Sequence, residues 1–244
     1  MSQPRILIIT PFRNEFHSIP FYLTALLSLD YPHELIDLYW LENDSTDRTL
    51  RLLKQVRGNL HFHHHEFRSK RIIGRVRKRT PGNYWKDLRY GRGRVRAWLI
   101  IWNQYFLPLI RKSRVDYVLL WYADAIPPSN VITEYLKVFK NHKDAGWVGG
   151  AMYRRYPRQK QVLSPWPTKA IHARKPVKVE LTGHVALIRR AALARCTLYY
   201  VAREMGYSLS RCLQKRGFYV YYQPSVFIKH VSTDGRIHDH KLRR

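Results

Sequence analysis

Three short polar segments contain most of the side chains in this 244-residue chain that could do chemistry. Each follows directly on an apolar run, and they comprise residues 10–15, 42–47 and 122–128. In an open parallel sheet, ligands bind beyond the carboxyl ends of the strands, so these segments would meet at one edge. Taken singly they are ambiguous, because an Asn-Asp-Ser run is typical of a helix cap and an Asp before two prolines is typical of a turn.

The elements that must position these segments follow from hydrophobic periodicity. Alternating strands and helices need right-handed crossovers, which place helices on both faces of a mainly parallel sheet. The predicted fold class is therefore α/β, in a single Rossmann-like domain. In the first half of the chain we expect strands at residues 5–10, 36–41, 60–64 and 116–121, and helices at residues 16–29, 45–56, 95–110 and 129–140.

The second half of the chain is less regular. Two stretches rich in Lys and Arg, residues 67–96 and 154–178, are predicted to be exposed basic loops, and both interleave cations with aromatic side chains. The remaining expected elements are a short strand at 146–149, an extended segment at 179–188, a helix at 203–216, strands at 218–222 and 226–230, and a basic tail at 231–244.

Together, in this order and spacing, the three polar segments resemble the GT-A fold glycosyltransferases, and among them family 2. The resemblance covers roughly residues 5–230 and implies transfer of a sugar from a nucleotide-sugar donor, most simply a UDP-sugar. Residues 1–125 would bind the donor and residues 126–230 the acceptor. The residues carried over to the nucleotide are Thr10, Pro11, Arg13 and Glu15 around base and ribose, Glu42 as the carboxylate that reads the base, Asp44 as a second candidate, and Arg96 with Arg94 as its alternative.

The resemblance also implies a divalent cation, Mn²⁺ or Mg²⁺. Asp124 matches the last carboxylate of the family's Asp-x-Asp motif, whose first acid is Tyr122 here, and Ala123 between them would also contact the donor. A hard cation takes oxygen ligands, and a diphosphate supplies two, so one carboxylate and one further protein ligand can suffice. His230 resembles the family's C-terminal metal histidine.

Transfer with inversion needs a general base that takes the proton of the acceptor hydroxyl. The family places this base at the start of a helix, and the only acid at the corresponding helix start in this chain is Glu204. The helix dipole alone would also favour an acid at this position. His184, in the segment Thr182-Gly183-His184, is a second candidate. The run His63-His64-His65 is not predicted to bind a metal, because neighbouring side chains of a strand alternate between faces.

Charge indicates the class of partner. Lys and Arg number 44 against 17 Asp and Glu, a formal charge of +27, which attracts nucleic acid, anionic lipid or phosphorylated substrates. The first hypothesis is a hydroxymethylated pyrimidine in DNA as acceptor, as in viral DNA-base glycosyltransferases. The alternatives are a membrane-linked saccharide, with the basic face on an anionic membrane surface, and a non-catalytic nucleic-acid-binding protein on a degenerate GT-A scaffold. A nucleotidyltransferase is disfavoured because residues 10–15 lack glycine.

Two cysteines, Cys196 and Cys212, are too few for a disulfide framework and indicate a reducing compartment. The longest apolar stretches fall short of the roughly 20 residues needed to cross a bilayer. The N-terminus lacks the pattern of a signal peptide. The chain is therefore expected to be cytoplasmic.

Overall fold

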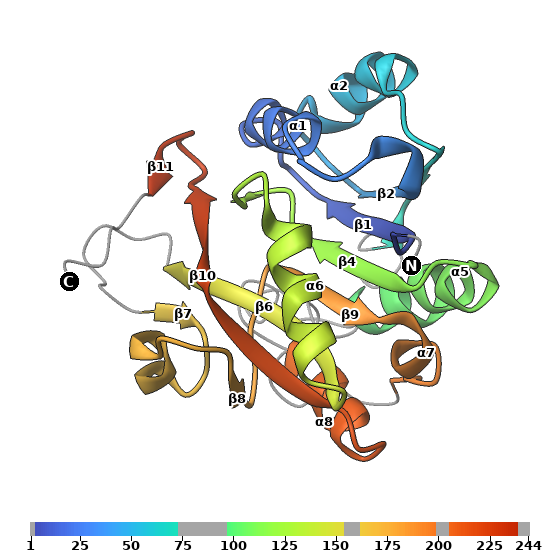
Figure 1. The fold of residues 1–244 in the computed structure, drawn as a ribbon. Helices are drawn as coiled ribbons and strands as arrows, with labels where there is room; N and C mark the ends of the chain where they lie inside the picture. The colour runs from blue at the N-terminus through green and yellow to red at the C-terminus, as the bar shows by residue number, and fades with distance from the viewer. Residues whose placement is uncertain (1–2, 73–96, 154–161, 199–204, 239–244) are drawn as a thin grey trace, which may run out of the picture.

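A mixed eleven-stranded sheet forms the centre of the molecule in a computed structural model, which describes residues 3–72, 97–153, 162–198 and 205–238. Its main path runs β11-β10-β6-β9-β4-β1-β2-β3 (Figure 1). The strands of this path are β1 (Ile6–Phe12), β2 (Ile36–Asn43), β3 (His64–Lys70), β4 (Tyr117–Trp121), β6 (Ala145–Tyr153), β9 (Val185–Arg189), β10 (Tyr219–Val231) and β11 (Ile237–His238).

Parallel pairing dominates the half of the sheet built from the first part of the chain. Strand β1 pairs in parallel with β2 and β4, and β2 pairs in parallel with β3. Strand β9 is antiparallel to β4 and β6, and β10 returns to the parallel direction beside β6. Three short strands lie off this path: β5 (Ala125–Ile126) and β8 (Val177–Val179) pair with β10, and β7 (Val162–Ser164) pairs with β6.

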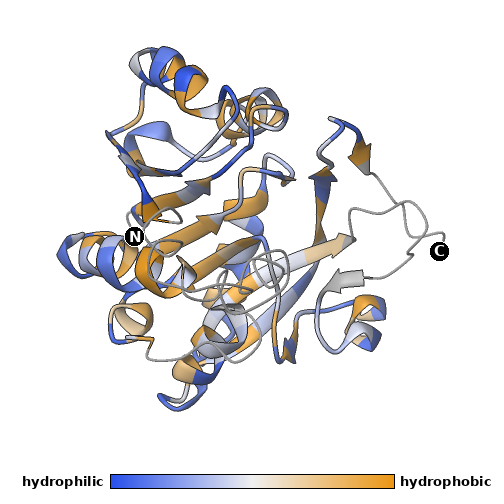
Figure 2. Ribbon diagram, turned by 180° about the vertical axis from the view of Figure 1, so that it is seen from behind, coloured by the Kyte–Doolittle hydropathy of each residue, from blue (hydrophilic) through white to orange (hydrophobic). Residues whose placement is uncertain are grey.

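Helices cover both faces of the sheet, and each face has its own core. On one face pack α1 (Ile19–Leu27), α2 (Thr49–Val56) and α6 (Val131–Asn141), with buried Trp40 and Trp121. On the other face pack residues 97–112, which include the π-helical turn η4 (Ile101–Phe106) and α5 (Leu107–Lys112), together with α7 (Arg190–Leu193) and α8 (Met205–Gln214). The described residues also contain three short 3₁₀ helices: η1 (His33–Leu35), η2 (Arg57–Asn59) and η5 (Thr168–His172). Figure 2 shows the apolar strands inside and the polar helix surfaces outside.

The predicted fold class is confirmed: the domain is α/β, with a largely parallel sheet and helices on both faces. Several predicted boundaries are wrong. The third strand is not at 60–64 but at His64–Lys70, where a polar edge strand pairs with β2. The two strands expected at 218–222 and 226–230 are the single strand β10, whose pairing with β6 shifts register between Tyr222 and Phe227.

The basic segments are also more ordered than predicted wherever the structure describes them. The segment 154–178 contains β7, η5 and the start of β8, and the segment 67–96 begins with the last residues of β3. The expected tail contributes β11, which pairs with the end of β10. Cys196 and Cys212 form a disulfide bond, which the sequence analysis did not predict because it took the two cysteines as a sign of a reducing compartment. Within the described residues, no helix has both the length and the apolar character of a membrane span.

Strand β6 packs so closely against its neighbours that side chains are excluded at three glycines, Gly146, Gly149 and Gly150. A Cβ atom on Gly149 would lie 2.1 Å from Thr182 Oγ1 and 2.7 Å from Thr182 Cβ, whereas one on Gly58 would meet nothing within 4 Å. We therefore expect Gly149→Ala to lower the free energy of unfolding by about 1–3 kcal/mol, because a central strand must shift. Urea denaturation measures this, with Gly58→Ala as the matched control; equal stability of the two variants would contradict the packing.

Candidate active site

The carboxyl ends of β1, β2 and β4 meet at one edge of the sheet. In the parallel registers, Phe12 lies opposite Glu42 and Ile9 lies opposite Leu120. The three polar segments that follow these strands therefore leave the sheet side by side. This is the arrangement that the sequence predicted, and it follows from parallel pairing alone.

Asp124 and His230 are brought together by a strand pairing of only two residues. Strand β5, directly after Asp124, runs antiparallel to the end of β10, with His230 opposite Ala125. The backbone N–H of Val231 donates to the carbonyl of Asp124 at 2.8 Å. His230 Nε2 lies 3.2 Å from Asp124 Oδ2, and the two residues are only 3% and 8% exposed. Two side chains 106 residues apart thus form one buried polar pair.

This pair fits the predicted divalent cation. Two ligands at right angles around an ion with bonds of about 2.2 Å lie about 3.1 Å apart, close to the observed spacing. A carboxylate oxygen with an imidazole nitrogen suits Mn²⁺ better than Mg²⁺, which prefers oxygen ligands. The described residues contain no group of three or more His, Cys, Asp or Glu side chains placed to hold a metal. As far as the described residues go, the diphosphate of a donor and water would have to supply the remaining ligands.

Aromatic rings line the approach to this pair. The Tyr122 ring lies 5.2 Å from the His184 ring and packs edge-on against Trp98 at 5.5 Å, and the His184 ring lies 6.0 Å from that of His230. The backbone N–H of Tyr122 donates to the carbonyl of His184 at 2.8 Å. His184 has a positive φ of 66°, a conformation that costs a non-glycine residue energy and that clusters at functional sites. Tyr122, where the family has an acid, thus joins the end of β4 to His184.

Several polar side chains at the end of β1 and in the loop that follows it form hydrogen bonds within the protein. Thr10 is fully buried, and its hydroxyl lies 2.9 Å from the Tyr22 hydroxyl in the core, so only its backbone lies near the edge. Glu15 Oε2 accepts a hydrogen bond from Ser18 Oγ at 2.8 Å, and the Glu15 N–H donates to Thr49 Oγ1. Pro11 is half-buried, and Arg13 is exposed beside them.

The loops after β1 and β2 brace each other. Asn14, at a positive φ of 55°, accepts the N–H of Thr46 at 2.8 Å. Asp47 accepts the N–H groups of Thr49 at 2.9 Å and Phe16 at 3.2 Å. Burial acts to raise the pKa of the Asp47 carboxyl, but these hydrogen bonds, with that of the Thr49 hydroxyl, bring the pKa below its ordinary value. The edge of the site is therefore held by hydrogen bonds between its own segments.

Glu42 and Asn43 end β2 on opposite faces of the sheet. Glu42 is 1% exposed and has both oxygens engaged, one with the Ser45 N–H at 2.7 Å and one with Ser69 Oγ at 2.5 Å. Asn43 is 4% exposed, and among the described residues its Oδ1 accepts no hydrogen bond. Side chains alternate along a strand, so Asn43 shares the face of Leu41, which belongs to the core beneath residues 97–112.

Asn43 is the polar side chain that the sequence analysis missed. A buried amide oxygen that accepts no hydrogen bond from the described residues is costly unless a ligand, water or another part of the chain supplies the donor. The signal was available in principle, since continuing the alternation of Tyr39 and Leu41 by one step places Asn43 on their face, but the predicted strand stopped at residue 41. Asp44, the second candidate, follows at a positive φ of 50° and is half-buried.

Some predicted site residues lie outside the described residues, namely Arg94, Arg96 and Glu204. Ala123 is buried at 2% exposure between Tyr122 and Asp124. His63 contacts Asp37 and Arg5 near the amino end of the sheet, with Nδ1 2.7 Å from Asp37 Oδ1. This histidine therefore belongs to an ion-pair cluster away from Asp124 and His230.

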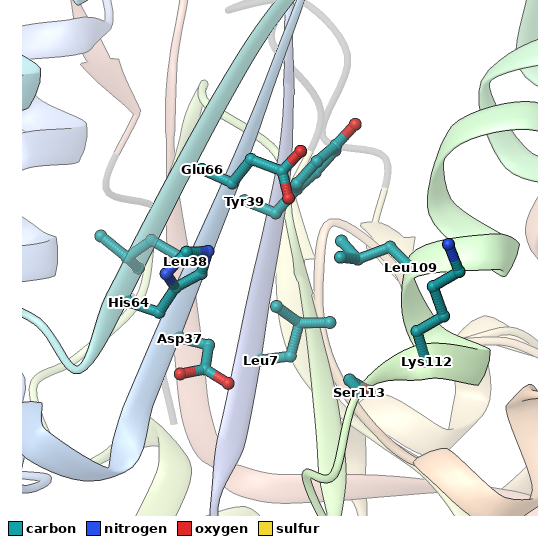
Figure 3. Close-up of a pocket in the computed structure, with 9 residues that line it drawn as sticks. All are labelled: Leu7, Asp37, Leu38, Tyr39, His64, Glu66, Leu109, Lys112 and Ser113. Carbon is teal, nitrogen blue, oxygen red and sulfur yellow. The ribbon is translucent and has the colours of Figure 1, made fainter.

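A separate pocket of about 190 Å³ lies between β2, β3 and α5 (Figure 3). Burial, the largest influence, raises the pKa of its Tyr39 to about 12. The residues that line the pocket belong to the middle and amino halves of β1–β3 and to the end of α5: Leu7, Asp37, Leu38, Tyr39, His64, Glu66, Leu109, Lys112 and Ser113. It is thus distinct from the carboxyl-end edge where the predicted site residues gather.

Solved structures share the fold. The mannosyltransferase PcManGT from Pyrobaculum calidifontis, in complex with GDP-Man and Mn²⁺, matches 95% of this chain and 58% of its own, with a TM-score of 0.61 and 16% identity. TarS 1–349 of S. aureus in complex with UDP matches 91% of this chain and 60% of its own, with a TM-score of 0.56 and 14% identity. At such identities the likeness concerns the fold, and the chain spans less than two thirds of either structure.

Curated relatives match over shorter stretches. The mannan polymerase II complex anp1 subunit of Schizosaccharomyces pombe is 43% identical over 51 residues, which are 21% of this chain and 12% of that protein. A glycosyltransferase 25 family member of Aedes aegypti is 25% identical over 125 residues, 50% of this chain and 20% of that protein. The predicted relationship to glycosyltransferases is confirmed at the level of the family, although the motifs had pointed to family 2. Residues 3–143, more than half of the chain, match the model of the glycosyltransferase family 25 N-terminal domain, and the chain belongs to that family.

Proposed function

We propose that this chain transfers a sugar from a nucleotide-sugar donor to an acceptor hydroxyl at the edge formed by β1, β2 and β4. The observation that carries the proposal is the buried pair of Asp124 and His230 at the end of β4, in a chain of a glycosyltransferase family. Two structures of the same fold were solved with GDP-Man and Mn²⁺ and with UDP. Either nucleotide would fit the proposal, and UDP is the one predicted from the sequence.

Each residue has a defined task in this proposal. Asp124 Oδ2 and His230 Nε2 would hold Mn²⁺, which neutralises the diphosphate charge that grows as the sugar leaves. His230 must then be neutral at Nε2, since a protonated nitrogen cannot bind a cation. Glu42 fixes the loop of Ser45 through the hydrogen bond at 2.7 Å. Asn43 would offer its amide to the base. In this proposal Asn43 therefore has the base-reading role that the sequence predicted for Glu42.

The transfer itself needs one proton acceptor. The acceptor oxygen forms a bond to the anomeric carbon, the bond from that carbon to the diphosphate oxygen breaks, and the acceptor proton passes to a carboxylate, for which Glu204 is the proposed residue. His184 is the alternative, beside the Asp124 and His230 pair. Inversion at the anomeric carbon is part of this proposal, since a single displacement exchanges the two faces.

Two acceptor classes are proposed in order. A saccharide hydroxyl comes first, because one relative is named as a subunit of a mannan polymerase complex. Hydroxymethylated DNA comes second, favoured by the formal charge of +27. An anionic membrane surface, as the place where a lipid-linked saccharide would be met, belongs to the first class.

The metal pair is tested by Asp124→Asn. We expect Mn²⁺-dependent hydrolysis or transfer of the donor sugar to fall about 100-fold or more, and Mn²⁺ affinity in calorimetry to weaken more than tenfold, because one anionic ligand is lost. Asp144→Asn is the matched control, since Asp144 is a partly exposed acid away from this site, paired with Lys178 at 2.7 Å. Full activity of Asp124→Asn would end the proposal, whatever the control does.

Base recognition is tested by Asn43→Asp. An amide both donates and accepts, whereas a carboxylate only accepts, so the variant should favour guanine, which presents two adjacent N–H donors, over uracil. We expect the ratio of UDP to GDP affinity, measured by calorimetry, to fall about tenfold. Asn59→Asp, at an exposed position, makes the same change of charge. An unchanged ratio in Asn43→Asp, or the same shift in Asn59→Asp, would remove Asn43 from the base site.

The acceptor class is decided by competition in one reaction. Enzyme with Mn²⁺ and radiolabelled UDP- and GDP-sugars is offered oligosaccharides and hydroxymethylated duplex DNA together. We expect label on the saccharide, since glycans are what the named relative builds. Label on DNA alone would reverse the order of the two acceptors while leaving the donor chemistry intact. Donor hydrolysis without either product would leave the acceptor outside both classes.

A further inference from the structure

The ends of three helices form an unusually basic surface on the face opposite α1, α2 and α6. They are the carboxyl ends of α5 and α8 and the turn that follows α7, which lie near one another at the lower right of Figure 1. We refer to this as the helix-end surface. Its cations are all exposed: Arg111, Lys112, Arg114, Arg195, Arg211, Lys215 and Arg216.

Specific contacts hold these helix ends together. The Arg111 guanidinium donates to the carbonyl of Ala194 at 2.9 Å and to Thr197 Oγ1 at 3.0 Å. The Arg216 guanidinium donates to the carbonyl of Arg195 at 2.9 Å. The disulfide between Cys196 and Cys212 joins the turn after α7 to α8. The cations therefore sit on one rigid platform rather than on independent loops.

The three segments that form this surface contain no acids of their own, although Asp116 follows the first of them and Lys112 shares a pocket with Asp37 and Glu66. Residues 107–115, 189–198 and 205–218 contain no Asp or Glu. Some cations elsewhere on the described surface have acidic partners, as Arg5 has with Asp37 at 3.1 Å and Lys178 with Asp144 at 2.7 Å. Within the described part of the chain, no ion pair joins a cation of the helix-end surface to an acid. The positions of Arg111 and Arg216 are explained by their hydrogen bonds to carbonyls at helix ends. The other five cations repel one another, and a bound anion would offset the free-energy cost of that repulsion.

The surface lies away from the candidate active site. Asp116, which follows α5 and precedes β4, donates its N–H to the carbonyl of Arg5, just before β1, and its own carbonyl accepts the N–H of Arg190. These contacts place the end of α5 and the start of α7 at the amino end of β1 and β4, whereas Asp124 follows the carboxyl end of β4. An anion bound here would not reach the Asp124 and His230 pair.

We propose that the helix-end surface binds the phosphate backbone of nucleic acid. Five of its seven cations are arginine, whose planar guanidinium matches phosphate oxygens in pairs. A lipid surface fits less well, because none of the five exposed large hydrophobic side chains of the described residues belongs to this surface: they are Phe16, Leu27, Trp166, Tyr219 and Ile237. Nucleic acid is on this proposal a partner held apart from the reaction, whether or not the proposed transfer occurs.

The test is the salt dependence of DNA binding by the full chain. Arg195→Gln/Arg211→Gln/Lys215→Gln removes three cations that hold no helix carbonyl in the described contacts. With fluorescence anisotropy on a labelled DNA duplex, we expect at least about tenfold weaker binding near 0.1 M salt, and a slope of log affinity against log salt reduced by about 2 to 3. Lys169→Gln/Arg174→Gln/Lys175→Gln removes the same charge from exposed positions of η5 and the loop before β8.

Each outcome bears on the proposal. A large loss in the helix-end variant with a small loss in the control supports it, whereas equal losses would mean that net charge alone binds DNA. Binding to phosphatidylserine vesicles that is lost in the same variant, with no DNA binding, would reassign the surface to membranes and overturn it. If thermal unfolding shows that the triple variant is misfolded, Lys112→Gln/Arg114→Gln repeats the measurement away from the disulfide. Donor hydrolysis should be unchanged in all these variants, which separates this proposal from that of the transferase.

Discussion

The parallel pairing of β1 with both β2 and β4 is the constraint on which the candidate site depends. It delivers three polar segments to one edge, in a register that sets Phe12 opposite Glu42 and Ile9 opposite Leu120. The second half of the chain adds to this edge by a two-residue antiparallel pairing, in which β5 aligns Ala125 with His230. That pairing gives the buried Asp124 carboxylate an imidazole neighbour, and a buried carboxylate is costly unless it is partnered. The pairing therefore makes the carboxylate stable and places an imidazole beside it.

At the end of β2, two neighbouring residues have different roles: Glu42 holds neighbouring protein groups in place, and Asn43 is the residue proposed to contact the nucleotide base. Glu42 turns to the face of Trp40, and both its oxygens hold protein groups, Ser45 and Ser69. Asn43 turns to the face of Leu41, with its amide oxygen uncommitted among the described residues. A carboxylate that is already satisfied has little to offer a ligand, whereas an unsatisfied buried amide gains from one. Thr10 follows the same logic as Glu42, because its hydroxyl is engaged with Tyr22 inside the core.

Much of the fold could be predicted from the sequence because buried parallel strands are continuous apolar runs. Residues 6–9 and 118–121 have no polar side chain and were located correctly. The position of strand β3 was predicted wrongly because β3 is a polar edge strand, and an edge strand need not consist of apolar residues. Strand β10 was split in two because Pro224 interrupts the pattern, but the register of its pairing with β6 shifts between Tyr222 and Phe227 and accommodates the proline. The pair of Asp124 and His230 was foreseen only through a family resemblance, since no local pattern links residues 106 positions apart.

The position of the basic surface limits what its charge can do. Electrostatic interactions between exposed charges fade over about 8–10 Å at physiological ionic strength. The helix-end surface lies at the amino end of β1 and β4, and its cations therefore contribute little to holding a diphosphate beside Asp124 at the carboxyl end. The fold does not depend on these cations either, because hydrophobic clusters on both faces of the sheet supply the core. A cationic platform that is too distant to serve the donor and costly to the fold is most simply explained by a polyanionic partner that touches it directly.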